Sequence, residues 1–120
     1  MATANRRTVL IAAAGAAAAA VAPALAERAE GAVAVFEADE PAARAFARSR
    51  ARRLAVDGDR VRFARKLFVE ARPARVVGMT RYADYLILAE AAREHGYRAV
   101  LAGQPGDGLF AWTAERGQGA

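Results

Sequence analysis

Short apolar runs alternate with stretches of helical periodicity from residue 31 onward, and no other feature restricts the fold of this chain as much. Short apolar runs bounded by turn residues predict buried strands, whereas apolar residues that recur about every three to four positions predict helices. The predicted strands cover residues 31–36, 54–56, 75–79, 98–102 and 109–114, and the predicted helices cover residues 41–53, 60–71 and 81–95. Alternation of this kind forms βαβ units, so we expect an α/β fold.

The connections between these elements indicate how the sheet is ordered. Right-handed crossovers place helices on both faces of a parallel sheet, so we expect a small three-layer domain with a mostly parallel sheet of four to five strands. The expected strand order is 2-1-3-4-5 with the last strand antiparallel, because the turn cluster Gln104–Gly108 folds the chain back. A two-layer α+β sandwich is the alternative, since the second strand is very short.

Single residues mark where the predicted helices begin and end. Pro41 follows acidic residues and starts the first helix, while Asp59 and Thr80 are the expected N-caps of the second and third helices. Pro73 ends the second helix. Gly96 stands where a left-handed residue closes the third helix.

The first 26 residues have the pattern of a secretory signal peptide. Arg6 and Arg7 precede an alanine-rich apolar stretch at residues 9–22, and Ala24 and Ala26 form a small-x-small cleavage site. The stretch is shorter than the roughly 20 residues that a membrane-spanning helix needs. We therefore expect a signal-peptide helix that is cleaved after Ala26, followed by a single α/β domain at residues 27–120.

The segment Asn5-Arg6-Arg7-Thr8-Val9-Leu10 resembles the motif of twin-arginine signal peptides. The resemblance implies a bacterial protein that folds before export, with the twin-arginine translocation machinery and signal peptidase as partners. Its destination would be the periplasm or the medium. Val9 replaces the usual phenylalanine and Ile11 the usual lysine, so the general secretory route remains an alternative, as does an uncleaved tether or no export. Residues 27–120 resemble, in general layout, small exported α/β proteins of proteobacteria that have no established activity.

Charge and composition argue against several classes of function. Arg6 and Arg7 are the only charged residues before residue 27, so their removal lowers the formal charge from +5 to +3, an ordinary value for a small domain. This charge does not favour nucleic acid as a partner, and we expect membrane contact only through the signal peptide. The chain has no cysteine, and its single serine and single histidine, Ser49 and His95, leave no material for a hydrolase triad.

Charged residues follow the predicted strands at the place where ligands gather in open parallel sheets. That place is the carboxyl edge of the sheet, where the strand order reverses, and here it lies between strands 1 and 3. Asp39 follows strand 1, Thr80 and Arg81 follow strand 3, and Asp57 and Asp59 follow the neighbouring strand 2. These five residues are the candidate ligand-binding residues.

Two kinds of ligand fit these residues. The helix N-terminus behind Thr80 attracts anions, and Arg81 offers a fork of donors to a carboxylate or phosphate. Alternatively, Glu37 and the three aspartates supply the oxygen ligands that Mg²⁺ or Ca²⁺ prefers. Helix capping and an ordinary strand-to-helix turn account for the same residues without a ligand. We predict no catalytic residue, no cofactor and no resident metal.

Arginines recur on one side of the first predicted helix. Arg44, Arg48 and Arg52 follow each other at a spacing of four residues, so they lie one above another. This basic side is either a solvated outer face or a surface for an anionic partner such as lipid head groups.

The predicted helix at residues 81–95 is apolar on more than one side. Leu86 and Ile87 point away from the main apolar stripe, which consists of Tyr85, Leu88, Ala89 and Ala92. A helix of this kind is buried on several sides or takes part in self-association. We expect an exported, non-enzymatic binding module for a small anion or a protein partner. The alternatives are an assembly protein that forms a homodimer through this helix and a divalent-metal-dependent enzyme that uses the acidic strand ends.

Overall fold

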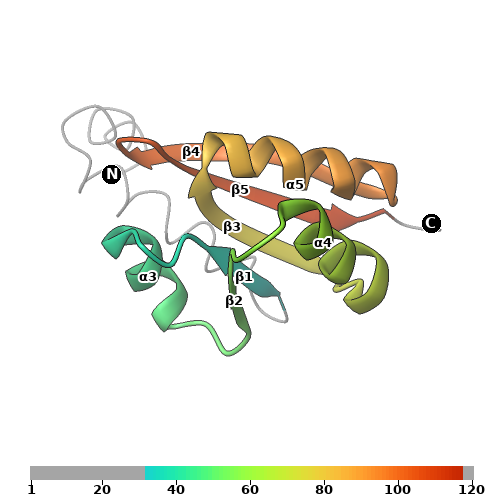
Figure 1. Cartoon of the computed structure of the whole chain (residues 1–120), viewed down its shortest axis with the longest axis horizontal. Helices are drawn as coiled ribbons and strands as arrows, with labels where there is room; N and C mark the ends of the chain where they lie inside the picture. Colours follow the sequence, from blue (N-terminus) through green and yellow to red (C-terminus); the bar gives the residue numbers. More distant parts are fainter. Residues whose placement is uncertain (1–31, 118–120) are drawn as a thin grey trace, which may run out of the picture.

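The computed structural model describes residues 32–117, which form a five-stranded sheet with helices packed against it (Figure 1). The predicted signal peptide, residues 1–26, lies outside the described residues. The α/β class and the five strands are confirmed. In chain order the elements are β1 (Val33–Phe36), α3 (Pro41–Arg48), β2 (Arg53–Ala55), α4 (Arg60–Arg65), the π-helical segment η1 (Lys66–Ala71), β3 (Arg75–Arg81), α5 (Tyr82–Glu94), β4 (Tyr97–Gly106) and β5 (Leu109–Arg116).

The sheet has the strand order β2-β1-β3-β5-β4. β1 pairs in parallel with β2 and β3, whereas β5 is antiparallel to both β3 and β4. The predicted order 2-1-3-4-5 is therefore wrong for the last two strands. The expectation of a mostly parallel sheet is also wrong, because the sheet is mixed and its antiparallel ladders are the longer ones.

β4 and β5 form a tight hairpin, as they do in the predicted order, so the two orders differ only in which of these strands lies beside β3. The predicted turn begins at Gln104, but β4 continues to Gly106 and pairs there with Leu109, so that only Asp107 and Gly108 form the turn. Gly108 has a positive φ of 72°, a backbone conformation that glycine adopts without steric cost. The hairpin fixes the pairing of β4 with β5 but does not decide which of the two strands lies beside β3.

Burial explains why β5 takes the inner position. Its buried apolar residues point to both faces of the sheet and are Leu109, Ala111, Trp112 and Ala114. β4 leaves Val100 and Leu101 exposed at the edge of the sheet, at 39% and 46%. The strand with more apolar surface to bury gains more from neighbours on both sides.

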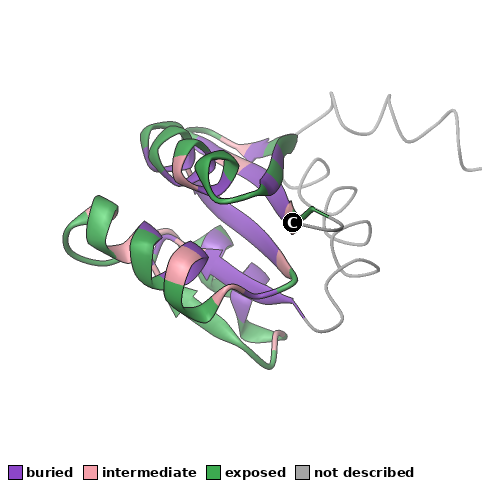
Figure 2. Cartoon of the chain, turned by 90° about the vertical axis from the view of Figure 1, so that its right-hand side faces the viewer, coloured by how far each residue is buried: buried purple, intermediate pink, exposed green. Residues whose placement is uncertain are grey.

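Helices cover both faces of the sheet, and the buried sheet lies between helices whose outer sides are exposed (Figure 2). On one face, Phe46 of α3 packs in a cluster with Val77 and Met79 of β3. On the other face, η1 and α5 cover a larger core that contains Phe68 and Leu88. The arrangement has the three layers that the alternation of elements predicts.

The predicted helix signals Asp59 and Gly96 act as expected, whereas the helix predicted at residues 60–71 changes its geometry part-way along. Asp59 caps α4, because its Oδ1 accepts hydrogen bonds from the backbone N–H groups of Val61 and Arg62 at 2.8 and 3.1 Å. Gly96 follows α5 with a positive φ of 87°. The predicted helix 60–71 becomes π-helical in η1 and ends at Arg72, which has a left-handed φ of 44°.

Thr80 is not the N-cap that the sequence predicts, because β3 extends through Arg81 and α5 begins at Tyr82 without a side-chain cap. Thr80 is fully buried instead, and its Oγ1 accepts a hydrogen bond from Nε1 of Trp112 at 3.0 Å. The indole also lies on the backbone of Gly78, where an added Cβ would be 2.1 Å from Cε2. The position of the Trp112 indole therefore requires glycine at residue 78 of β3.

Candidate functional site

The carboxyl ends of β1 and β3 lie next to each other where the strand order reverses. The register pairs Phe36 with Met79, so that Glu37, after β1, and Arg81, at the end of β3, are neighbours. In open α/β sheets this is the place where ligands bind.

Carboxylates of this chain surround the Arg81 side chain. Its Nη1 donates to Oε1 of Glu37 at 3.0 Å, and its Nη2 donates to both carboxylate oxygens of Asp39 at 2.9 and 3.0 Å. Nη2 also donates to Oε2 of Glu40 at 3.1 Å, and the Arg81 backbone N–H donates to Oε2 of Glu37 at 3.0 Å. The hydrogen bonds from Arg81 hold the pKa of Asp39 below its usual range. The guanidinium is thus engaged within the chain.

Glu37 joins this group to the start of α5. Its side chain is 3% exposed and bonds to Asp84, whose Oδ1 also accepts from Nε of Arg60 at 2.8 Å. Burial raises the pKa of Glu37 to about 7, and the hydrogen bond with Asp84 adds to this effect. Burial acts against ionisation of Asp84 too, but hydrogen bonds from Glu37 and Arg60 hold its pKa below the usual range. Burial and the bond to Asp84 thus favour the protonated form of Glu37, and the hydrogen bonds that Asp84 accepts favour its ionised form.

Six residues from the segment after β1 and from β3, α4 and α5 form one network, which we call the charged cluster. Its members are Glu37, Asp39, Glu40, Arg60, Arg81 and Asp84.

We expect Glu37→Gln to raise stability at alkaline pH. The pKa of Glu37 in the folded chain, about 7, is above its ordinary value of 4.5. The stability from its protonated form is therefore full below pH 4.5 and is lost as the pH rises through 7. The amide of the variant donates to Asp84 at every pH, while its single oxygen accepts from one of the two Arg81 donors that bond to Glu37. Its free energy of unfolding should exceed that of the parent by about 1–2 kcal/mol at pH 8 and match it near pH 5.

Urea denaturation at both pH values measures this difference. Glu70→Gln, at an exposed position on η1, is the matched control and should leave the pH dependence unchanged. A Glu37→Gln variant that loses stability at pH 8 would show that the ionised carboxylate is the favoured form.

Of the five candidate residues, Asp39 and Arg81 form an ion pair, and Oγ1 of Thr80 donates to the backbone carbonyl oxygen of its neighbour Arg81 at 3.0 Å. Asp59 is occupied as the cap of α4, and Thr80 is buried beneath Trp112. Asp57 is exposed and acts on the cluster through its charge on Arg60 alone. The acidic strand ends do not converge on one point.

Sequence reasoning missed Glu40, Arg60 and Asp84 as members of the cluster. One signal for Asp84 was available, because it stands four residues before Leu88 and so lies on the buried side of the helix. An acid in that position needs a partner, since a buried charge is costly unless it is paired. No local pattern shows that the partners are Glu37 and Arg60.

Within residues 32–117, no three histidine, aspartate or glutamate side chains are grouped so that they could hold a metal ion. In the charged cluster, the guanidinium of Arg81 lies among the carboxylates in the position that a cation would need. The arrangement gives no support to the metal-dependent enzyme considered from the sequence.

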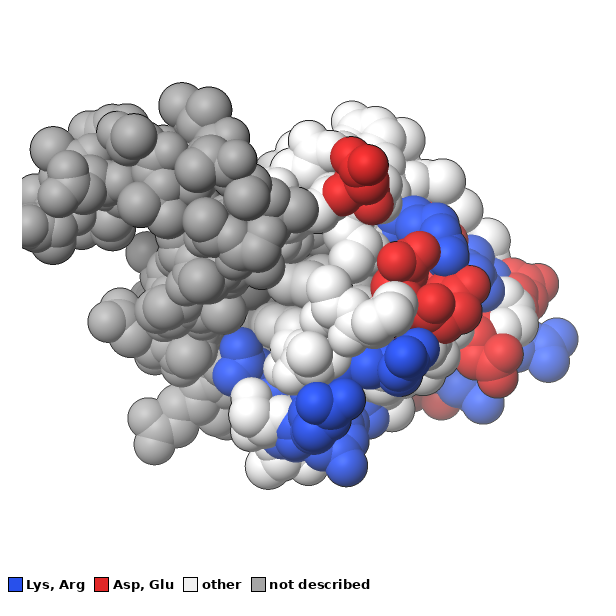
Figure 3. All heavy atoms as spheres, turned by 90° about the vertical axis from the view of Figure 1, so that its left-hand side faces the viewer, with Lys and Arg blue, Asp and Glu red and all other residues white. Residues whose placement is uncertain are grey.

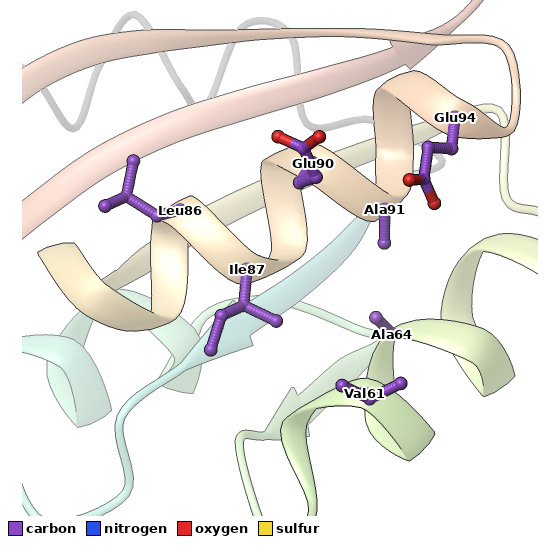
Figure 4. Close-up of a pocket in the computed structure, with 7 residues that line it drawn as sticks. All are labelled: Val61, Ala64, Leu86, Ile87, Glu90, Ala91 and Glu94. Carbon is purple, nitrogen blue, oxygen red and sulfur yellow. The ribbon is translucent and has the colours of Figure 1, made fainter.

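A second feature is an apolar groove of about 390 Å³ between α4 and α5, which we call the α4–α5 groove. Val61 and Ala64 of α4 lie opposite Ile87 and Ala91 of α5 (Figure 4). Val61 is 70% exposed and Ile87 is 39% exposed. The remaining lining residues are Leu86, Glu90 and Glu94. The main apolar stripe of the helix is buried, whereas Leu86 and Ile87 face this groove.

The basic side of α3 is partly used inside the domain. In Figure 3, basic side chains gather along one end of the face drawn, with acidic side chains beside them. α3 ends at Arg48, before the predicted end at residue 53, and Nη1 of Arg53 donates to the carbonyl oxygens of Arg48 and Arg50 at 3.1 and 3.2 Å. Arg50 itself stacks on the ring of Phe46. The guanidinium group of Arg53 therefore caps the C-terminal end of α3.

Among the described residues, no helix is long and apolar enough to cross a membrane. The chain matches no family of known proteins, and neither a curated protein nor a solved structure matches it. Its function must therefore be inferred from the charged cluster and the α4–α5 groove.

Proposed function

We propose that this chain is an exported, non-enzymatic binding domain whose ligand is a protein that docks in the α4–α5 groove. The observation that carries the proposal is the exposure of apolar side chains on two adjacent helices, with Leu86 at 48% and Val61 at 70%. Contiguous exposed apolar surface on a small domain is typical of an interaction site. A groove between helices accepts the apolar face of a helix from a partner.

A protein ligand fits this chain better than a small anion does. Glu90 and Glu94 are the charged residues that line the groove, and they repel an anion. The other candidate for anion binding, Arg81, has its guanidinium engaged by Glu37, Asp39 and Glu40. An anion at Arg81 would have to displace these carboxylates, and each displaced carboxylate would repel it.

A photo-crosslinking residue in the groove tests the proposed function. We expect p-benzoylphenylalanine at Leu86 to give a discrete protein adduct in cells that export the chain. The same residue at Ala45, exposed on α3, is the control and should give none. Val61→Glu together with Ile87→Glu places charge in the groove and should abolish the adduct. An adduct at Ala45 that matches the one at Leu86, or no adduct at either site, would overturn the proposal.

The export part of the proposal is supported by the pattern of residues 1–26 alone. We expect Arg6→Lys with Arg7→Lys to stop passage by the twin-arginine route, because lysine keeps the charge but lacks the planar fork of donors. Cell fractionation followed by mass spectrometry measures this, and the exported parent should begin at Glu27. Unchanged export of the double variant would assign the chain to the general secretory route.

A further inference from the structure

We propose that the protein in the α4–α5 groove is a second copy of this chain, so that the chain forms a symmetric dimer. The inference rests on the proposed function of the groove and names its occupant. Its basis is the way in which charge is arranged on the two rims of the groove.

The two rims of the groove, one formed by α4 and the other by α5, carry opposite charges. Glu90 and Glu94 line the groove on the α5 side. On the α4 side, Arg65 lies one helical turn beyond Val61 and so faces the same way, and Arg62 adjoins it on the exposed surface. The side chains of these two glutamates and two arginines form no ion pair or hydrogen bond with any residue in the part of the chain that the structure describes.

A two-fold axis that runs along the groove brings unlike rims together. The rotation places α4 of one copy over α5 of the other, so that arginines meet glutamates on both sides of the axis. The same rotation covers the apolar residues that line the groove, since Val61 of each copy then faces the α5 residues of the other copy. Such an interface is self-complementary and closes as a dimer.

Charge reversal on the rims tests the dimer. Sedimentation equilibrium of the chain purified from exporting cells should give the mass of two chains. Arg62→Glu with Arg65→Glu places acid against acid, and Glu90→Arg with Glu94→Arg places base against base. Each pair should weaken dimerisation by at least about tenfold. The four changes combined restore opposite rims and should restore the dimer.

Leu101→Lys provides the matched control. Leu101 is exposed at 46%, close to the 48% of Leu86, but it lies on the edge strand β4 and not in the groove. It should leave the dimer intact. Circular dichroism of every variant establishes that the fold is retained, which surface changes of this kind permit.

Two results would overturn the dimer. One is the mass of a single chain at all concentrations, and a groove-dependent adduct of Leu86 with a different protein would then still support the proposed function. The other is a dimer that survives both rim variants and dissociates with Leu101→Lys, because this would place the interface at the edge of β4. Absence of both a dimer and an adduct would reject the proposed function as well.

Discussion

Gly78→Ala is expected to lower the free energy of unfolding by about 3 kcal/mol or more. The added Cβ would lie 2.1 Å from Cε2 and 2.5 Å from Nε1 of Trp112. Neither group can move aside easily, because the indole is fully buried and bonded to Thr80, while Gly78 lies in a strand that is paired on both sides. Urea denaturation followed by tryptophan fluorescence measures the loss, since Trp112 is the only tryptophan.

Two further variants separate the clash from a general effect of alanine. Gly106→Ala is the control, because an added Cβ at this strand glycine meets nothing within 4 Å, and it should change stability little. Trp112→Leu removes the indole that the added Cβ would meet, so this change and Gly78→Ala should cost less together than the sum of their separate costs. Strict additivity, measured by circular dichroism, would contradict the proposed contact.

Arg81→Met is expected to cost about 1–2 kcal/mol at pH 8, because the Arg81 side chain is 42% exposed and only Glu37 among its partners is buried. Arg81 is the shared ion-pair partner of Glu37, Asp39 and Glu40, and its removal leaves these carboxylates facing one another beside Asp84. Methionine keeps an unbranched apolar stem, so the change reports mainly on the lost charge. The cost should be smaller at pH 5, because like-charged carboxyl groups that have lost their partner take up protons more readily.

Urea denaturation at the two pH values measures both the cost and its pH dependence. Arg48→Met is the matched control, because this exposed arginine on α3 forms no ion pair with another described residue. It should be nearly neutral. A cost for Arg81→Met that is equal at pH 5 and pH 8 would show that packing, and not the carboxylates, accounts for the role of Arg81.

The charged cluster changes how the carboxyl edge of the sheet should be understood. In many α/β domains this edge is open to ligands, but here Arg60 and Arg81 connect the segment after β1 with β3, α4 and α5 through carboxylates of the same chain. The cluster holds together the elements that form the larger core. Binding is therefore proposed at the outer side of α4 and α5, where apolar side chains are exposed and the charged side chains of the groove rims have no partner among residues 32–117.

The sequence alone predicts the secondary-structure elements of this domain closely, because their signals are local. Strands and helices follow from periodicity, and Asp59 and Gly96 act within one helical turn of their own positions. The α/β class follows from the same alternation. The sequence also predicts that Asp39 and Arg81 lie at one edge of the sheet, since this requires only two parallel strands.

Tertiary structure alone decides the order of the last two strands, the members of the charged cluster and the exposure of the groove. Whether β4 or β5 lies beside β3 depends on a comparison of buried area between whole strands, which the turn at Asp107 does not reveal. Glu37 meets Asp84 only because β1 and β3 are in register and α5 follows directly. Leu86 stays exposed because α4 and α5 leave a groove between them. These outcomes depend on contacts between distant segments, whose energies are settled only when the whole domain packs.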